Sequence, residues 1–168
     1  MRQRVVNTLA AVIVAIPAAA LSVGTPPATA GGPVEAGGTL LPFAQVYRRC
    51  DFSTNTHTGA TGYARPTAVL RTTSGEVVAD VQIATAVPGT HYDVRLIQMP
   101  RPSSTPCGAG DPGVAVAAIE TDEVGAGATT VRGPIAPGAT GVWMFISRPG
   151  EFSQTPAEFY TTDYVAKI

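Results

Sequence analysis

The sequence is poor in the residues that build nucleic-acid-binding and anionic-lipid-binding surfaces. Lysine occurs once, at Lys167, and the chain contains no run of like charge. Charged residues make up 14% of the chain, and its formal net charge is −1. A nucleic-acid-binding protein needs a basic patch that displaces counterions from phosphates, and anionic lipid attracts clusters of basic residues. We therefore expect no nucleic-acid partner and no electrostatic docking to a membrane.

The motifs of common catalytic chemistries are also missing. No Gly-x-Ser-x-Gly occurs, and the acidic cluster Glu120, Asp122 and Glu123 lies in and beside an expected turn, where acidic residues are usual. Histidine occurs twice, as His57 and His91, and no spacing typical of metal ligands joins the two. The sequence thus indicates no catalytic residue, no cofactor and no metal, with metal binding by the two histidines as a weaker alternative.

Cysteine is limited to Cys50 and Cys107. The two residues are too far apart in the sequence for a Cys-x-x-Cys redox pair. In an exported protein, two cysteines predict one structural disulfide. Closing a loop of about 58 residues would contribute roughly 4 kcal/mol on the chain-entropy model.

The N-terminus has the pattern of a secretion signal. Arg2 and Arg4 precede an apolar run from Leu9 to Val23, and Ala28-Thr29-Ala30 has the form of a cleavage site. We expect residues 1–30 to be removed and the protein to be secreted or held in the cell envelope. The apolar run is shorter than the roughly 20 residues of a spanning helix, so no membrane span is expected after cleavage. Cleavage removes two of the 11 basic residues and none of the 12 acidic ones, which changes the formal charge to −3.

Glycine and proline, at 18 and 15 residues, punctuate the rest of the chain. Between them lie short stretches in which apolar and polar residues alternate with the period of a β-strand. Residues 31–38 are expected to form a flexible leader. Residues 39–168 are predicted to form an all-β domain, an antiparallel β-sandwich of immunoglobulin-like or jelly-roll-like type with about seven or eight strands.

The clearest alternation runs from Glu76 to Met99. Pro88-Gly89 in its middle indicates a turn, and a preceding strand over Tyr63–Arg71 would complete a three-stranded meander. Residues 122–127 are likewise expected to connect two strands of a hairpin. The run Val142–Ser147 is apolar at nearly every position, which predicts a strand buried on both faces.

Two sets of residues on expected strands are candidates for binding. His91, Asp93 and Arg95 alternate along one strand and would form a polar stripe on one face. Tyr160 and Tyr164 share a face of an expected last strand over residues 158–167, where they could form an aromatic platform for a sugar.

These observations leave two hypotheses open. The first is a secreted, non-catalytic protein that binds a protein, glycan or lipid in the cell envelope or outside the cell. The second is a secreted hydrolase with a site on the loops 52–62 and 100–113, held together by the Cys50–Cys107 disulfide, with His57 as its base.

A series of turn and strand patterns lies in the segments Pro88–Leu96, Cys107, Thr121–Gly127, Pro137–Trp143 and Pro156–Ile168. This series resembles that of small secreted β-sandwich proteins of actinobacteria that have no assigned function. The resemblance covers about residues 63–168 and implies an exported β-sandwich, without implying any catalytic residue.

Overall fold

The fold is taken from a computed structural model that describes residues 37–168. The expected signal peptide and most of the expected leader lie outside the described residues. Nine strands and no helix occur in the described range, so no helix there is long and apolar enough to cross a membrane. The strands are β1 (Thr39–Ala44), β2 (Thr67–Thr73), β3 (Glu76–Ile83), β4 (His91–Met99), β5 (Val114–Glu120), β6 (Gly127–Pro134), β7 (Gly141–Arg148), β8 (Glu158–Thr162) and β9 (Ala166–Lys167).

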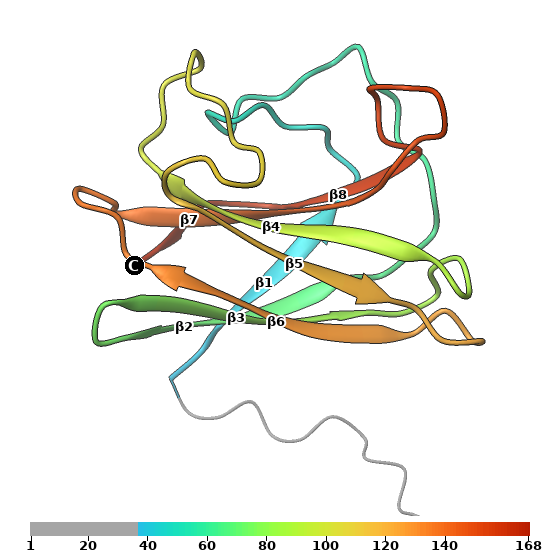
Figure 1. The fold of residues 1–168 in the computed structure, drawn as a ribbon, viewed down its shortest axis with the longest axis horizontal. Helices are drawn as coiled ribbons and strands as arrows, with labels where there is room; N and C mark the ends of the chain where they lie inside the picture. The colour runs from blue at the N-terminus through green and yellow to red at the C-terminus, as the bar shows by residue number, and fades with distance from the viewer. Residues whose placement is uncertain (1–36) are drawn as a thin grey trace, which may run out of the picture. The chain divides into compact units, whose positions relative to one another are not determined.

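The strands form two layers that share β1 (Figure 1). Hydrogen bonding follows the order β5-β4-β7-β8-β1-β2-β3-β6, all antiparallel, with β9 paired to β7. Residues 39–42 of β1 pair with β2 in one layer, and residues 43–44 pair with β8 in the other. Pro42, which has no N–H to donate, lies where the strand changes partners. The sheet is thereby nearly closed into a barrel, and the predicted antiparallel all-β sandwich is confirmed.

The core lies between the layers, and the sequence periodicity identifies the faces that form it. Val77, Val81 and Ile83 of β3 are buried, as are Tyr92 and Leu96 of β4. Their sequence neighbours Val78, Asp80 and Gln82 on β3, and Asp93 and Arg95 on β4, are all less buried.

The predicted meander is wrong in one connection. β3 pairs with β2 and β6, whereas β4 pairs with β5 and β7, so residues 84–90 cross from one layer to the other. Residues 121–126 cross the same way from β5 to β6, and the expected hairpin there is also wrong. The alternation of apolar and polar residues identifies which face of a strand is buried. The same alternation occurs whether the next strand pairs with this strand or lies in the opposite layer, so it does not predict the connection. The β2–β3 hairpin is confirmed.

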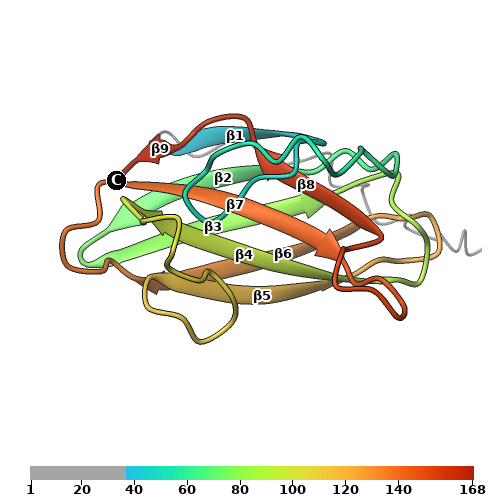
Figure 2. The same ribbon diagram turned by 90° about the horizontal axis from the view of Figure 1, so that it is seen from above.

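β7 is buried on both faces, as predicted. Val142, Met144 and Ile146 belong to the core between the layers, while Trp143 and Phe145 belong to a second apolar cluster on the outer side. The connection from β1 to β2 passes over this outer face of the sheet (Figures 1 and 2).

The predicted disulfide is confirmed, and it holds the cover of the second cluster in place. Cys50 and Cys107 are bonded, with Cα atoms 5.5 Å apart. Beside the bond, the Phe52 ring packs edge-on against Trp143 at 5.5 Å, and the Tyr47 ring packs edge-on against Phe159 at 5.1 Å. The disulfide therefore joins two loops across an apolar cluster.

Candidate functional site

The two loops joined by the disulfide form a cover, and among residues 37–168 no acid or nucleophile lies within hydrogen-bonding distance of the His57 side chain. His57 is exposed, and its side chain makes no hydrogen bond to any residue in the described range. In the other loop, the buried guanidinium of Arg101 donates hydrogen bonds to the carbonyls of Pro106 and Pro112. A general base must lie within reach of an acid and a nucleophile. The geometry of residues 37–168 supplies neither to His57.

The predicted polar stripe lies on the outer face of β4 and lines a hollow of about 410 Å³. The His91 ring is hydrogen-bonded through Nδ1 to Glu120 and through Nε2 to Asp93 at 3.2 Å. The Arg95 guanidinium lies 4.7 Å from the centre of the Phe145 ring and donates to the carbonyl of Cys107 at 3.5 Å. Each cation of the stripe thus has a partner within the protein.

A pH titration should single out His91. The hydrogen bond to Glu120 and, next, that to Asp93 raise the pKa of His91 above its ordinary value of 6.5. Protonated His91 therefore stabilises the fold; this stabilisation is complete below the unfolded-state pKa and is lost as the pH rises through the folded-state pKa. We expect the advantage in urea midpoint of the wild-type protein over His91→Gln to be full below pH 6.5 and to shrink as the pH rises through the raised folded-state pKa of His91.

The matched control for this titration is His57→Gln, because the side chain of His57 lacks a carboxylate partner among the described residues. An advantage over His91→Gln that stays constant with pH would contradict the assignment. So would an equal pH slope in both variants.

The predicted aromatic platform of Tyr160 and Tyr164 is not formed. The expected single strand is interrupted at residues 163–165, between β8 and β9. Tyr160 is buried and points into the core, whereas Tyr164 is partly exposed and donates a hydrogen bond to the carbonyl of Leu40 at 2.7 Å. Because Tyr160 is buried in the core, the rings of Tyr160 and Tyr164 do not form one surface that could bind a sugar.

Tyr160 instead belongs to a buried network around Glu158, whose side chain is 1% exposed. The carboxylate accepts hydrogen bonds from the hydroxyls of Tyr92, at 2.8 Å, and of Tyr160. It also pairs with the Arg148 guanidinium at 3.2 Å. Burial and then the bond to Glu158 raise the pKa of both tyrosines, so both hydroxyls remain protonated donors.

The segment before β2 closes this network from solvent. The backbone N–H of Ala64 donates to the Tyr160 hydroxyl at 2.8 Å. Gly62 has a φ of +99°, and a side chain there would collide with the Glu158 carboxylate. The hydrogen-bonding groups of this network are therefore paired within the protein interior, and a substrate has no access to them.

Four connections at one end of the sandwich carry exposed apolar side chains, a feature that the sequence did not reveal. Four connections reach this end of the sandwich: the one that leads into β2, and those that follow β3, β5 and β7 (Figure 1). Each carries one exposed large apolar residue. These are Tyr63 at 85% exposure, Val87 at 46%, Val124 at 77% and Phe152, which is fully exposed. We call this set the loop-end surface.

Hydrogen bonds between the loops fix three of these four residues. Thr85 Oγ1 donates to the carbonyl of Tyr63 at 3.0 Å, and Ala86 N–H donates to the carbonyl of Gly125 at 3.0 Å. Thr121 Oγ1 donates to the carbonyl of Val87 at 2.6 Å. The exposed side chains are thus presented by loops that are already ordered.

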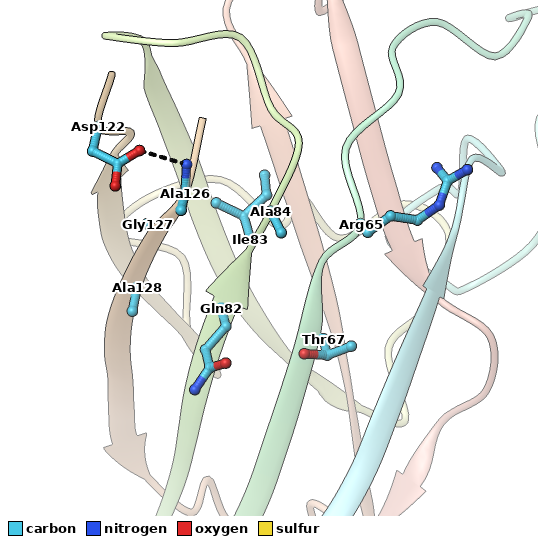
Figure 3. Close-up of a pocket in the computed structure, with 9 residues that line it drawn as sticks. All are labelled: Arg65, Thr67, Gln82, Ile83, Ala84, Asp122, Ala126, Gly127 and Ala128. Atoms are coloured by element: carbon cyan, nitrogen blue, oxygen red, sulfur yellow. Dashed lines mark hydrogen bonds between the residues drawn. The ribbon is translucent and has the colours of Figure 1, made fainter. Parts of the chain in front are cut away.

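A groove of about 460 Å³ lies beside this surface, on the outer face of β2, β3 and β6 (Figure 3). Its floor contains small residues, Ala84, Ala126, Gly127 and Ala128, which leave room above the strands. Its polar side chains come from four different elements. They are Arg65 before β2, Thr67 of β2, Gln82 of β3 and Asp122 before β6.

No metal centre is evident in this part of the chain. Among residues 37–168, no three His, Cys, Asp or Glu side chains are grouped so that they could hold a metal ion.

The fold and these surfaces define the described region as a disulfide-bonded, antiparallel β-sandwich that is nearly closed into a barrel. In comparisons with known proteins, the chain matches no family model, no curated protein and no solved structure.

Proposed function

We propose that the protein is exported and acts without catalysis, by binding a partner in the cell envelope or the extracellular space through its loop-end surface. The observation that carries the proposal is the placement of one exposed large apolar side chain on each of four connections at one end of the sandwich. A contiguous apolar surface on a folded domain is typical of an interaction site, and a partner that covers this end of the sandwich would bury all four side chains together.

The order of the loops supports binding in a second way. Loops held by a rigid scaffold commonly carry binding residues. Because Tyr63, Val87 and Val124 lie on loops linked by hydrogen bonds, binding would require little further ordering of the backbone.

Export is supported by the sequence pattern of residues 1–30, and the Cys50–Cys107 disulfide is compatible with an oxidising compartment. The hydrolase alternative has no comparable support, because the side chain of His57 has no acid or nucleophile within hydrogen-bonding distance in the described range.

Retention of the exported protein by envelope fractions of its source cells tests the proposal. We expect the double variant Tyr63→Ser/Phe152→Ser to be retained at least about tenfold more weakly than the wild-type protein, because removal of central aromatic contacts typically weakens binding by that amount or more. Both side chains are exposed, so circular dichroism and the urea midpoint should stay unchanged.

The matched control is Leu40→Ser/Val116→Ser. These two residues are exposed at 55% and 51% but lie outside the four connections. Equal retention of the two double variants would exclude the loop-end surface as the binding site. Failure of the wild-type protein to bind any envelope or extracellular fraction would exclude the proposed function itself.

A further inference from the structure

The groove beside the loop-end surface holds polar groups whose hydrogen-bonding capacity is not used within residues 37–168. The side chains of Thr67 and Gln82 make no hydrogen bond to another described residue. Asp122 accepts the N–H groups of Val124 and Ala126 through Oδ1 alone, at 3.0 and 2.8 Å, which leaves Oδ2 for a ligand. The Ala126 bond is drawn in Figure 3.

Arg65 lies at the β2 edge of the groove, and its guanidinium points away from Gln82 and Asp122 (Figure 3). Its Nη1 donates to the carbonyls of Tyr63 and Ala64 at 3.1 and 3.2 Å, and these bonds leave Nη2 and Nε free to bind a ligand. Neither Arg65 nor Asp122 forms an ion pair with another residue in the described range. The groove therefore offers donors and acceptors together on the outer face of the sheet.

The charge of the groove selects the class of ligand. One guanidinium and one carboxylate give a formal charge of zero, which favours an uncharged ligand over a phosphate, a sulfate or an amine. The amide of Gln82 and the Nε and Nη2 groups of Arg65 each place two polar atoms side by side, a geometry that matches two adjacent hydroxyls, and Asp122 offers Oδ2 to a single hydroxyl. Such pairs of hydroxyls are characteristic of sugars.

The backbone of β3, in the middle of the groove, cannot bind an extended peptide, whereas β6 at its edge is the terminal strand of the sheet. β3 is hydrogen-bonded to β2 on one side and to β6 on the other, so its backbone cannot pair with an added strand. A ligand over β3 must therefore be recognised by side chains. The volume of about 460 Å³ falls within the range of small-molecule sites.

Tyr63 is an exposed aromatic residue near the groove in the chain, although it is not one of the residues that line the groove. It lies two residues before Arg65, and its carbonyl accepts hydrogen bonds from both Arg65 and Thr85. Its ring is exposed, and the flat apolar face of an aromatic ring can pack against the C–H face of a pyranose.

We propose that this groove binds a neutral carbohydrate, with Gln82, Thr67 and Asp122 recognising its hydroxyls, and with Arg65 and Tyr63 contacting the part of the sugar that extends past the β2 edge. The inference rests on the proposed binding function and gives that function a ligand class. It differs from the expected platform of Tyr160 and Tyr164, since it uses the opposite layer of the sandwich and an exposed tyrosine.

The test is binding of the full exported protein to an array of neutral glycans, followed by calorimetry with the best neutral oligosaccharide. The array also carries sulfated and sialylated glycans, so that attraction to Arg65 alone would be seen. We expect selective binding of neutral glycans, and a loss of about tenfold or more in affinity for Gln82→Ala and for Thr67→Ala. Thr73→Ala is the matched control, because Thr73 is exposed on the same strand and face as Thr67 but at its opposite end.

Three results would overturn the inference. The first is that the protein binds no neutral glycan while its retention by envelope fractions still depends on Tyr63 and Phe152. In that case the carbohydrate inference is wrong and the proposed binding function still holds. The second is a preference for the sulfated or sialylated glycans. The third is neutral glycan binding that is unchanged in Gln82→Ala and Thr67→Ala, which would place the sugar elsewhere on the protein.

Discussion

Replacing Glu158 with alanine should lower the free energy of unfolding by roughly 3–5 kcal/mol, as expected when one partner of a buried ion pair is removed. The carboxylate is the shared acceptor for Tyr92, Tyr160 and Arg148, so its loss leaves three donors without their partner at once. Arg148 is 32% exposed and can regain water, which places the expected loss toward the lower end of that range. Equilibrium urea unfolding measures it.

Glu158→Gln is the matched variant, because it keeps the shape of the side chain and an acceptor for one tyrosine hydroxyl. We expect a loss of about 1–2 kcal/mol, since the charge-assisted bond to Arg148 is weakened while the cavity stays filled. Equal losses in the two variants would show that the charge of Glu158 carries its whole contribution. A loss below about 1 kcal/mol in Glu158→Ala would contradict the buried network.

Much of the fold could be predicted because alternation reports burial directly. The inward residues of β3 and β4, and the double burial of β7, follow from side-chain period alone. The path of the chain between layers could not be predicted in this way. The turn signal at Pro88-Gly89 is real, but residues 84–90 also contain Thr85 with a φ of +55°, and together they carry the chain across the core.

The candidate sites were harder to predict because they depend on segments distant in the sequence. Tyr160 was expected on a surface, yet the opposite layer and residues 61–64 enclose it. Glu158 gave no signal, since its partners Tyr92 and Arg148 lie on other strands. The loop-end surface joins four connections that no local pattern relates. The polar stripe was correctly placed on one face of β4, because strand period alone determines that placement.

Removing the disulfide with Cys50→Ser/Cys107→Ser should lower the free energy of unfolding by about 4 kcal/mol on the chain-entropy model. The two cysteines are separated by 57 positions, so the bond restricts a long segment of the unfolded chain. Urea unfolding of the double variant against the oxidised wild-type protein measures this loss. The wild-type protein unfolded in the presence of a reductant is the control, and it should show a loss of the same size.

The native state of the double variant distinguishes this entropic effect from a loosened cover. The cover has attachments besides the disulfide: Tyr47 packs on Phe145 and Phe159, and Val46 accepts a hydrogen bond from Thr161 at 2.7 Å. We therefore expect it to remain in place without the bond. Trp143 is the one tryptophan of the chain and lies buried beneath Phe52, so its fluorescence reports on the cover. A red-shifted Trp143 emission before urea is added would mean that the disulfide also holds the native cover closed. Unchanged emission would mean that the disulfide stabilises the protein by restricting the unfolded chain.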